Sequence, residues 1–135
     1  NVNELFLFHG TSTLKVGKLI AEQGMDNRVA DDKGLYGAGC YFADWSCKSA
    51  QYTDTKRSGT HVFLLCRVLM GFPCMIRGNA IHKRRPDQNE DTNRPYDSIF
   101  AQKGVANQGD QKHNEYVVFE STQVYPEYLV QFTLP

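Results

Sequence analysis

Apolar residues occur along this chain in short runs, which polar and glycine-containing stretches separate. Runs of this kind favour strands, and they cover residues 4–8, 40–43, 60–71, 114–119 and 127–134. The run THVFLLCRVLMG at 60–71 is apolar at nearly every position except Arg67, which is typical of a strand covered on both faces. We therefore expect it to lie in the middle of a sheet. Pro126 separates the last two runs.

Two stretches have the spacing of short helices. In TSTLKVGKLIAEQG, at 11–24, hydroxyl side chains precede apolar residues at roughly helical intervals, and Gly24 provides a stop signal. In WSCKSAQY, at 45–52, a second helix would have Asp44 as its N-cap. Because strands and helices do not alternate regularly, the sequence predicts an α+β fold with mostly antiparallel pairing.

Two longer polar segments connect these elements. Residues 26–39 are polar and then glycine-rich, which predicts a loop. Residues 78–113 include the charged run HKRRPD, and their length indicates a functional loop or lid. The run HKRRPD is also compatible with a solvated basic turn.

The length and charge of the chain limit the number of domains and the kinds of binding surface that it can have. Its 135 residues suit one domain over 1–135, and 15 basic side chains balance 15 acidic ones. This balance argues against a dominant nucleic-acid or membrane surface. No apolar run is long enough to span a bilayer, and no signal-peptide pattern opens the chain. Because a strand begins almost at once, we expect a portion of a longer protein.

The cysteine pattern bears on metals and on the compartment. The chain contains Cys40, Cys47, Cys66 and Cys74, with no C-x-x-C pair and no histidine at a finger-like offset. The sequence therefore predicts no structural zinc. We expect reduced thiols and an intracellular protein, either nuclear or cytoplasmic.

The strand at 4–8 is followed by His9 and Gly10, and two interpretations of this pair are open. In one, the strand enters a turn in which Gly10 supplies an unusual backbone angle. In the other, the strand delivers His9 to a pocket, and Gly10 lets a ligand approach the main chain. These residues alone do not choose between the two.

The segment 40–52 gathers two phenol rings and a hydroxyl. On a helix, Ser49 and Tyr52 would share one face, and Tyr41 would come from the preceding strand. Such a group could hold a flat heteroaromatic amide by stacking and hydrogen bonding. The same rings could close a core beneath the helix, and spacing alone favours that structural interpretation.

Two further features also allow two interpretations. The stretch GLYGAG at 34–39 matches neither the dinucleotide fingerprint nor the P-loop, so it predicts either a flexible loop or one that covers a ligand. Glu115 starts a strand, where a glutamate is usually a solvated edge charge. Alternatively, its carboxylate projects into a cleft that His9 also borders.

Four motifs occur in the following order along the chain: LFHGT, GAGCYFADWSCKSAQY, NEYVVF and QVYPEYLV. Together they resemble the catalytic domain of the poly(ADP-ribose) polymerase family, a branch of the diphtheria-toxin-like ADP-ribosyltransferases. The resemblance covers residues 5–134. It implies the ADP-ribosyltransferase fold, in which two mostly antiparallel sheets pack together with a few short helices. It also implies a catalytic triad of His9, Tyr41 and Glu115.

The resemblance implies a reaction as well. NAD+ would be consumed as a substrate, with no metal, and ADP-ribose would pass from nicotinamide to a protein acceptor, this chain itself being one candidate. Glu115 would bind the 2′-OH of the nicotinamide ribose and stabilise the positive charge that develops on that sugar. A glutamate at this place accompanies polymer-forming members, which favours polymer slightly. The stretches RPYDSIF and YPEYL are similar to a branch with both tankyrases and single-unit transferases.

Binding roles follow from the same resemblance. His9 would bond the adenine-side ribose, while the main chain of Gly10 and the hydroxyl of Ser49 would hold the carboxamide. The nicotinamide ring would lie between Tyr52 and Tyr41. Further contacts are implied for Ala43, which leaves space, for Thr11 and Arg28 near the adenosine and phosphates, for Tyr36 in a flap over 29–39, and for Lys48.

Two other functions are compatible with these residues. An NAD+ glycohydrolase would transfer ADP-ribose to water. A binding module would recognise NAD+ or ADP-ribose without turnover.

Overall fold

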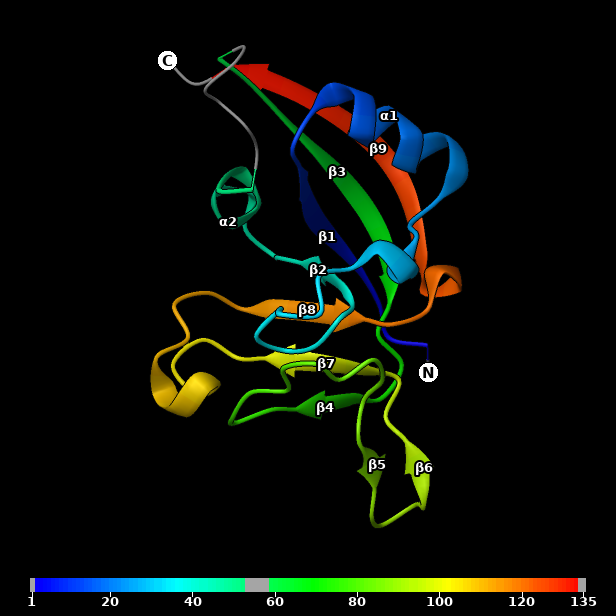
Figure 1. The fold of residues 1–135 in the computed structure, drawn as a ribbon, viewed down its shortest axis with the longest axis vertical. Coiled ribbons are helices and arrows are strands. Elements are labelled where there is room, and N and C mark those ends of the chain that lie inside the picture. The colour runs from blue at the N-terminus through cyan, green and yellow to red at the C-terminus, as the bar shows by residue number, and fades with distance from the viewer. Residues whose placement is uncertain (1, 53–58, 134–135) are drawn as a thin grey trace.

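The computed structural model describes residues 2–52 and 59–133, which form two main sheets (Figure 1). The first has the order β1-β3-β9, with β1 at Glu4–Thr11, β3 at Thr60–Leu69 and β9 at Val124–Thr133. The second has the order β2-β8-β7-β4, with β2 at Cys40–Phe42, β8 at Glu115–Val118, β7 at Ser98–Ala101 and β4 at Pro73–Met75. All neighbours in the sheets are antiparallel except the β4–β7 pair. The predicted α+β class, with β3 in the centre of its sheet, is confirmed.

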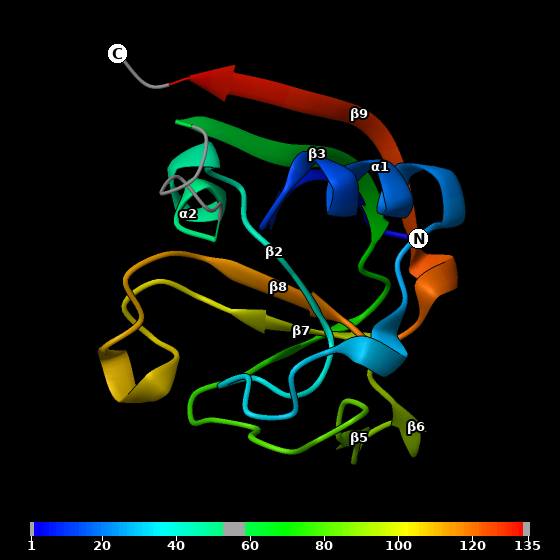
Figure 2. The same ribbon diagram turned by 45° about the horizontal axis from the view of Figure 1, so that its top comes forward.

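Helix α1, at Leu14–Gln23, confirms the helix predicted within 11–24, and it packs on the first sheet (Figure 2). The Thr13 hydroxyl caps it by accepting from the Val16 N–H, and Gly24 ends it with a φ of 83°. Gly17 allows the close approach, because a β-carbon there would lie 2.8 Å from Leu129 on β9. Short 3-10 turns lie at Asn27–Val29, Asn107–Gly109 and Ser121–Gln123.

Helix α2 differs from its prediction. It covers only Ser46–Ala50, so Tyr52 lies in the turn that follows, and its N-cap is Trp45, with no side-chain cap. The predicted cap, Asp44, instead accepts hydrogen bonds from Asn114, which precedes β8, and from Tyr116, which lies in β8. That prediction is wrong because tertiary partners take the carboxylate away from the helix start.

The segment 78–113 contains more structure than the predicted loop or lid. It holds β7, buried between β8 and β4, and a small hairpin of β5 at Gln88–Asn89 and β6 at Arg94–Pro95. The Ser98 hydroxyl anchors β7 by donating to the Met70 carbonyl at 2.7 Å. An apolar stretch as short as SIFA between polar neighbours is a weak strand signal, which explains the error.

Strand β9 begins before the predicted position and contains Pro126. The pairing with β3 shifts at Leu65/Cys66, so that Leu65 faces Tyr128 and Cys66 faces Pro126. This bulge and the edge position of β9 accommodate a residue that has no N–H to donate.

The two sheets meet where β1 and β2 touch. Phe8 and Ala43 exchange main-chain hydrogen bonds of 2.8 and 2.9 Å. A shared core lies beside this bridge and consists of Leu7, Met25, Cys40, Phe42, Leu64, Cys66, Val68, Met70 and Val118. The second half of β1, the end of β2 and the start of β8 are therefore brought to one place.

Three observations concern disulfides, membrane-spanning helices and metal ligands. All four cysteines are free thiols. Within 2–52 and 59–133, none of the helices has the length and apolar character needed to cross a bilayer. The same residues contain no group of three or more His, Cys, Asp or Glu side chains arranged to hold a metal ion.

Candidate active site

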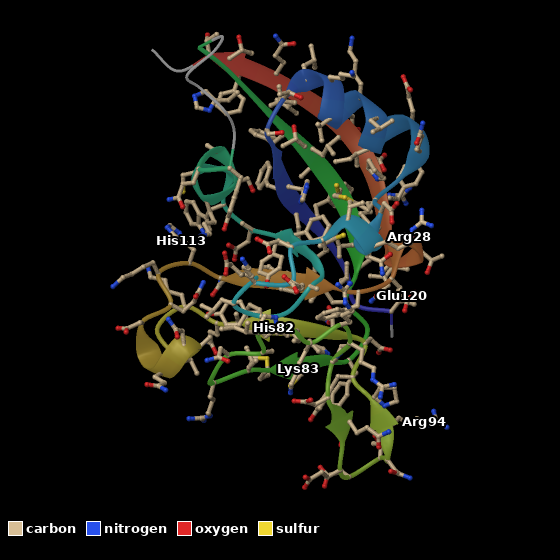
Figure 3. All side chains as sticks on the ribbon, viewed as in Figure 1. Arg28, His82, Lys83, Arg94, His113 and Glu120 are labelled. Carbon is tan, nitrogen blue, oxygen red and sulfur yellow. The ribbon has the colours of Figure 1, made fainter. Side chains whose placement is uncertain are left out.

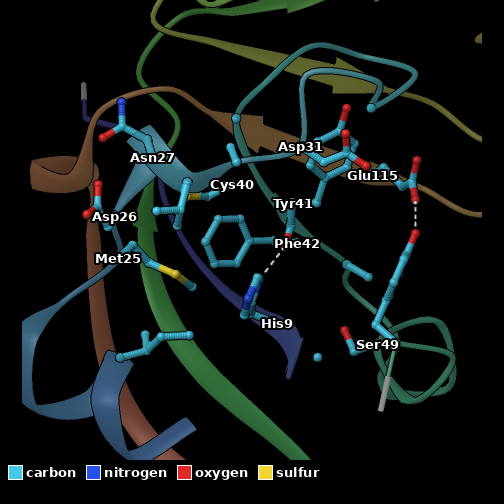
Figure 4. Close-up of a pocket in the computed structure, with 18 of the residues that line it drawn as sticks. His9, Met25, Asp26, Asn27, Asp31, Cys40, Tyr41, Phe42, Ser49 and Glu115 are labelled. Atoms are coloured by element: carbon cyan, nitrogen blue, oxygen red, sulfur yellow. Dashed lines mark hydrogen bonds between the residues drawn. The ribbon is translucent and has the colours of Figure 1, made fainter. Parts of the chain in front are cut away.

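A cavity of about 1150 Å³ lies where the two sheets meet (Figure 4). Its walls come from β1, α1 and the segment after it, the 34–39 loop, β2, α2 and the residues before β8. Most of the residues singled out from the sequence line it: His9, Gly10, Arg28, Tyr41, Ala43, Lys48, Ser49, Tyr52 and Glu115. Thr11 and Tyr36 are not among its lining residues.

His9 is held in one tautomer by the main chain. Its Nδ1 lies 2.8 Å from the carbonyl oxygen of Tyr41. A carbonyl only accepts, so Nδ1 carries the proton, and in the neutral ring Nε2 is a hydrogen-bond acceptor. Burial lowers the pKa of His9 below 6.5, although the bond to the Tyr41 carbonyl opposes this effect. The ring is therefore neutral at pH 7.

This lowered pKa predicts a pH dependence of stability. The unfolded chain takes up a proton on His9 near pH 6.5, whereas the folded chain resists it, so the free energy of unfolding should fall as the pH drops below 6.5. Above pH 6.5 His9 is neutral in both the folded and the unfolded chain, so this loss of stability is absent there. In His9→Asn, whose amide can still donate to the Tyr41 carbonyl, this part of the slope should be missing. Urea unfolding from about pH 8 to pH 5 measures it, and equal slopes in both proteins would contradict it.

Gly10 continues strand β1 rather than entering a turn. It pairs with Phe63, and its φ lies outside the left-handed region, so the turn interpretation is wrong. A β-carbon at Gly10 would lie 2.0 Å from the main-chain oxygen of Ser49. Gly10 thus allows α2 to pack directly on β1.

The main chain of Gly10 also faces the cavity side of the strand. Phe8 exchanges both of its main-chain bonds with Ala43, on the edge of β1 away from β3. Alternate residues of a strand turn their N–H and C=O groups the same way, so those of Gly10 point to this edge too. The residue lines the cavity there.

Tyr41 stabilises the glycine-rich loop. Its hydroxyl accepts from the Tyr36 N–H at 2.9 Å and donates to the Gly37 carbonyl at 2.8 Å. Burial raises the pKa of the Tyr41 phenol well above 10, and the negative charge of Glu115 adds to this increase. A β-carbon at Gly34 would lie 2.5 Å from the same hydroxyl. The loop therefore needs both the glycine and the phenol.

Glu115 is a buried charge with two partners on the opposite wall. It is 7% exposed, which excludes the solvated-edge interpretation. Lys48 Nζ lies 3.1 Å from Glu115 Oε1, and the Tyr52 hydroxyl donates to the same oxygen at 3.4 Å. Burial lowers the pKa of Lys48, but the charge and hydrogen bond of Glu115 outweigh it, and the pKa is raised above 10.5. The lysine is therefore charged at neutral pH and balances Glu115.

Three residues implied near NAD+ have other partners in the structure. Arg28 lines the cavity, but its guanidinium forms two bonds of 2.8 Å with Asp26. Thr11 is buried and donates to the Thr13 carbonyl at 3.2 Å. Tyr36 is buried and donates to Gln111, and burial raises the pKa of its phenol to about 12. The 34–39 loop still borders the cavity through Gly34, Leu35 and Gly39.

The polar lining residues that the sequence did not single out include Asp26, Asn27, Asp31, Gln111, Lys112 and His113. In Figure 3, Arg28 and His113 lie on opposite sides of the molecule, and both of them line the cavity. Lys112 and His113 directly precede the NEYVVF motif, so their position in the chain was a usable signal. The acidic residues follow α1 and belong to no motif quoted above.

Comparisons with known proteins find similarity along almost the whole chain. A sequence profile of the poly(ADP-ribose) polymerase catalytic domain matches residues 1–134. The human protein named protein mono-ADP-ribosyltransferase PARP12 is 40% identical over 133 residues, which are 98% of this chain and 17% of that protein. Mouse protein mono-ADP-ribosyltransferase PARP11 is 31% identical over 153 residues, covering 97% of this chain and 43% of that protein. The chain thus spans less than half the length of these relatives.

Proposed function

This chain belongs to the poly(ADP-ribose) polymerase family, and we propose that it is an ADP-ribosyltransferase that consumes NAD+. One observation carries the proposal. His9 from β1, Tyr41 from β2 and Glu115 from β8 line a single cavity, together with the hydroxyl-bearing Ser49 of α2. The cavity, at about 1150 Å³, is slightly larger than the usual small-molecule site of about 300–1,000 Å³, so it is large enough for a dinucleotide.

The chemical character of each wall supports a binding role. Nε2 of neutral His9 would accept a hydrogen bond from a hydroxyl of the adenine-side ribose. The main chain of Gly10, at the edge of β1 away from β3, would pair with the carboxamide of nicotinamide, and Ser49 would add its hydroxyl. Tyr52 and Tyr41 would flank the nicotinamide ring.

Glu115 would supply the charge that the reaction needs. The bond between C1′ of the ribose and the nicotinamide nitrogen breaks, and its electron pair leaves with neutral nicotinamide. Positive charge develops on the ribose, as in glycoside hydrolysis. A buried carboxylate opposite that sugar stabilises this charge and binds the 2′-OH. The acceptor then forms a bond to C1′ and loses its proton, for which Glu115 is the proposed base.

For product length we propose transfer of a single ADP-ribose unit. The names of the relatives at 40% and 31% identity contain the term mono-ADP-ribosyltransferase. The slight preference for polymer, which rested on Glu115, finds no support in those names. We also propose a protein acceptor inside the cell, since free thiols favour a reducing compartment.

One experiment tests the proposal. The protein is incubated with NAD+ labelled in its adenine part, released nicotinamide is quantified by chromatography, and covalent label is sized on a denaturing gel. We expect nicotinamide release with one discrete labelled protein band. A ladder would replace single transfer by polymer formation, and release without protein label would indicate a glycohydrolase. NAD+ binding by calorimetry without release would indicate a binding module and overturn the proposal.

A further inference from the structure

Asp44 is a charged residue beside the cavity that the proposed chemistry does not use. It follows β2 and precedes α2, and it is not among the lining residues of the cavity. Its Oδ1 is buried and forms no hydrogen bond with the described part of the chain. Its Oδ2 accepts from Asn114 Nδ2 at 2.8 Å and from the Tyr116 hydroxyl at 3.2 Å.

These two donors are the residues on either side of Glu115. Consecutive side chains of a strand point to opposite faces, so Glu115 points to the cavity while its neighbours reach Asp44. A single carboxylate oxygen thereby holds β8 just before and just after the residue proposed to do the chemistry. The Tyr116 ring is also stacked on Phe100 of β7, with 4.8 Å between the ring centroids.

The network continues into the chain that leads to β8. Asn114 uses its other end, Oδ1, to accept from the Lys103 N–H at 2.9 Å. Lys103 lies just after β7, so Asn114 closes the base of the 102–114 segment that connects β7 to β8. Asp44 therefore holds the Asn114 side chain, and Asn114 in turn holds the segment that precedes Glu115.

Asp44 also lies just before α2, which forms the cavity wall opposite Glu115. The helix α2 carries Lys48, whose ammonium contacts Glu115, and Ser49, and Tyr52 follows it. Within the described residues, the N-cap residue Trp45 forms no side-chain cap for this helix. The bonds from Asp44 to Asn114 and Tyr116 are thus side-chain links between the beginning of α2 and the beginning of β8.

We propose that Asp44 is a positioning residue, which sets the distance between α2 and β8 so that the Glu115 carboxylate meets Lys48, Tyr52 and the reacting ribose. This inference rests on the proposed function. It assigns Asp44 no contact with NAD+. Helix α2 is also held against β1, where Gly10 meets the Ser49 main chain, so loss of the Asp44 bonds should move the start of β8 rather than α2. The effect on the reaction therefore passes through Glu115 and belongs to the chemical step rather than to substrate binding.

The expected signature is a loss of kcat with little change in KM. In Asp44→Ala both bonds are lost, and a displaced catalytic group can cost up to about 100-fold, so we expect kcat to fall about 10- to 100-fold. The KM for NAD+ should stay within about threefold, because the variant leaves the lining residues in place. Asp44→Asn keeps a carbonyl oxygen that accepts from the same donors, so it should restore kcat to within about threefold of wild type.

A double-mutant cycle with Glu115→Gln separates this role from a general loss of structure. If Asp44 acts through Glu115, then Asp44→Ala should cost less than about twofold in kcat once Glu115→Gln is present. The matched control is Asp97→Ala, which removes an exposed carboxylate that accepts from the Phe72 N–H at 2.7 Å, away from the cavity. It should leave kcat unchanged. If Asp44→Ala does not fold, Tyr116→Phe, which keeps the ring, takes its place in the cycle with a smaller expected loss of a few-fold.

The outcomes are distinct. An unchanged kcat in Asp44→Ala, an equal loss with and without Glu115→Gln, or failure of Asp44→Asn to restore kcat would each overturn the inference while leaving the transferase intact. If wild-type protein releases no nicotinamide from NAD+, the proposed function fails and the positioning role fails with it.

Discussion

Replacement of Glu115 by glutamine is expected to lower the turnover of NAD+ by about 10²–10³-fold. Glutamine has the same shape and can still accept the bond from the Tyr52 hydroxyl, but it carries no charge to stabilise a positive ribose. The loss should appear in kcat, with KM for NAD+ nearly constant, because the charge is needed only when the bond breaks. Initial rates of nicotinamide release over a range of NAD+ concentrations measure both parameters.

The fold should survive this change. The variant leaves Lys48 without its counter-charge, but the flexible lysine stem can carry its ammonium to solvent. The matched control is Glu22→Gln, an exposed glutamate on α1 outside the cavity, which should keep wild-type kcat. If Glu115→Gln keeps wild-type kcat, or loses it only through unfolding, Glu115 does not have the role given to it.

Replacement of Gly10 by alanine is expected to destabilise the whole protein. The new β-carbon would lie 2.0 Å from the Ser49 main-chain oxygen and 2.9 Å from its carbonyl carbon. Main-chain atoms cannot rotate away as a side-chain tip can, so α2 or β1 must shift. Overpacking of this kind costs about 3 kcal/mol in the free energy of unfolding, which corresponds to a fall in Tm of about 10 °C. Thermal unfolding followed by circular dichroism measures it.

Gly78→Ala is the matched control for this substitution. A β-carbon at Gly78 meets nothing within 4 Å, and its φ is not in the left-handed region. Alanine there should leave stability unchanged or raise it by about 0.4–1 kcal/mol, because it restricts the unfolded chain. Equal Tm values for Gly10→Ala and Gly78→Ala would show that α2 does not pack on β1 as closely as described.

Elements with strong local signals agree with their predictions. The run at 60–71 contains the central strand β3, and the hydroxyls and Gly24 delimit α1. In these cases the apolar pattern, the cap and the stop signal lie within one short stretch. The motif order also identified the family, since it depends on residue types along the chain.

Elements whose partners are distant in sequence were missed or misjudged. Strand β7 has only four residues and is stabilised by β8 and β4 on either side. Asp44 fits the N-cap pattern, yet its hydrogen-bond partners come from residues 114 and 116. Local patterns carry no information about which distant groups compete for a side chain, so the cap prediction failed.

By itself, the sequence determined the α+β class, the central strand, the first helix and the family, because each depends on local periodicity or on the order of short motifs. Only the tertiary structure decided that Gly10 packs against the Ser49 main chain, that Glu115 is buried against Lys48, and that Asp44 joins β8. Each of these contacts joins residues about 40 or more positions apart. Their distances depend on how the two sheets close on one another, which no single stretch of the chain encodes.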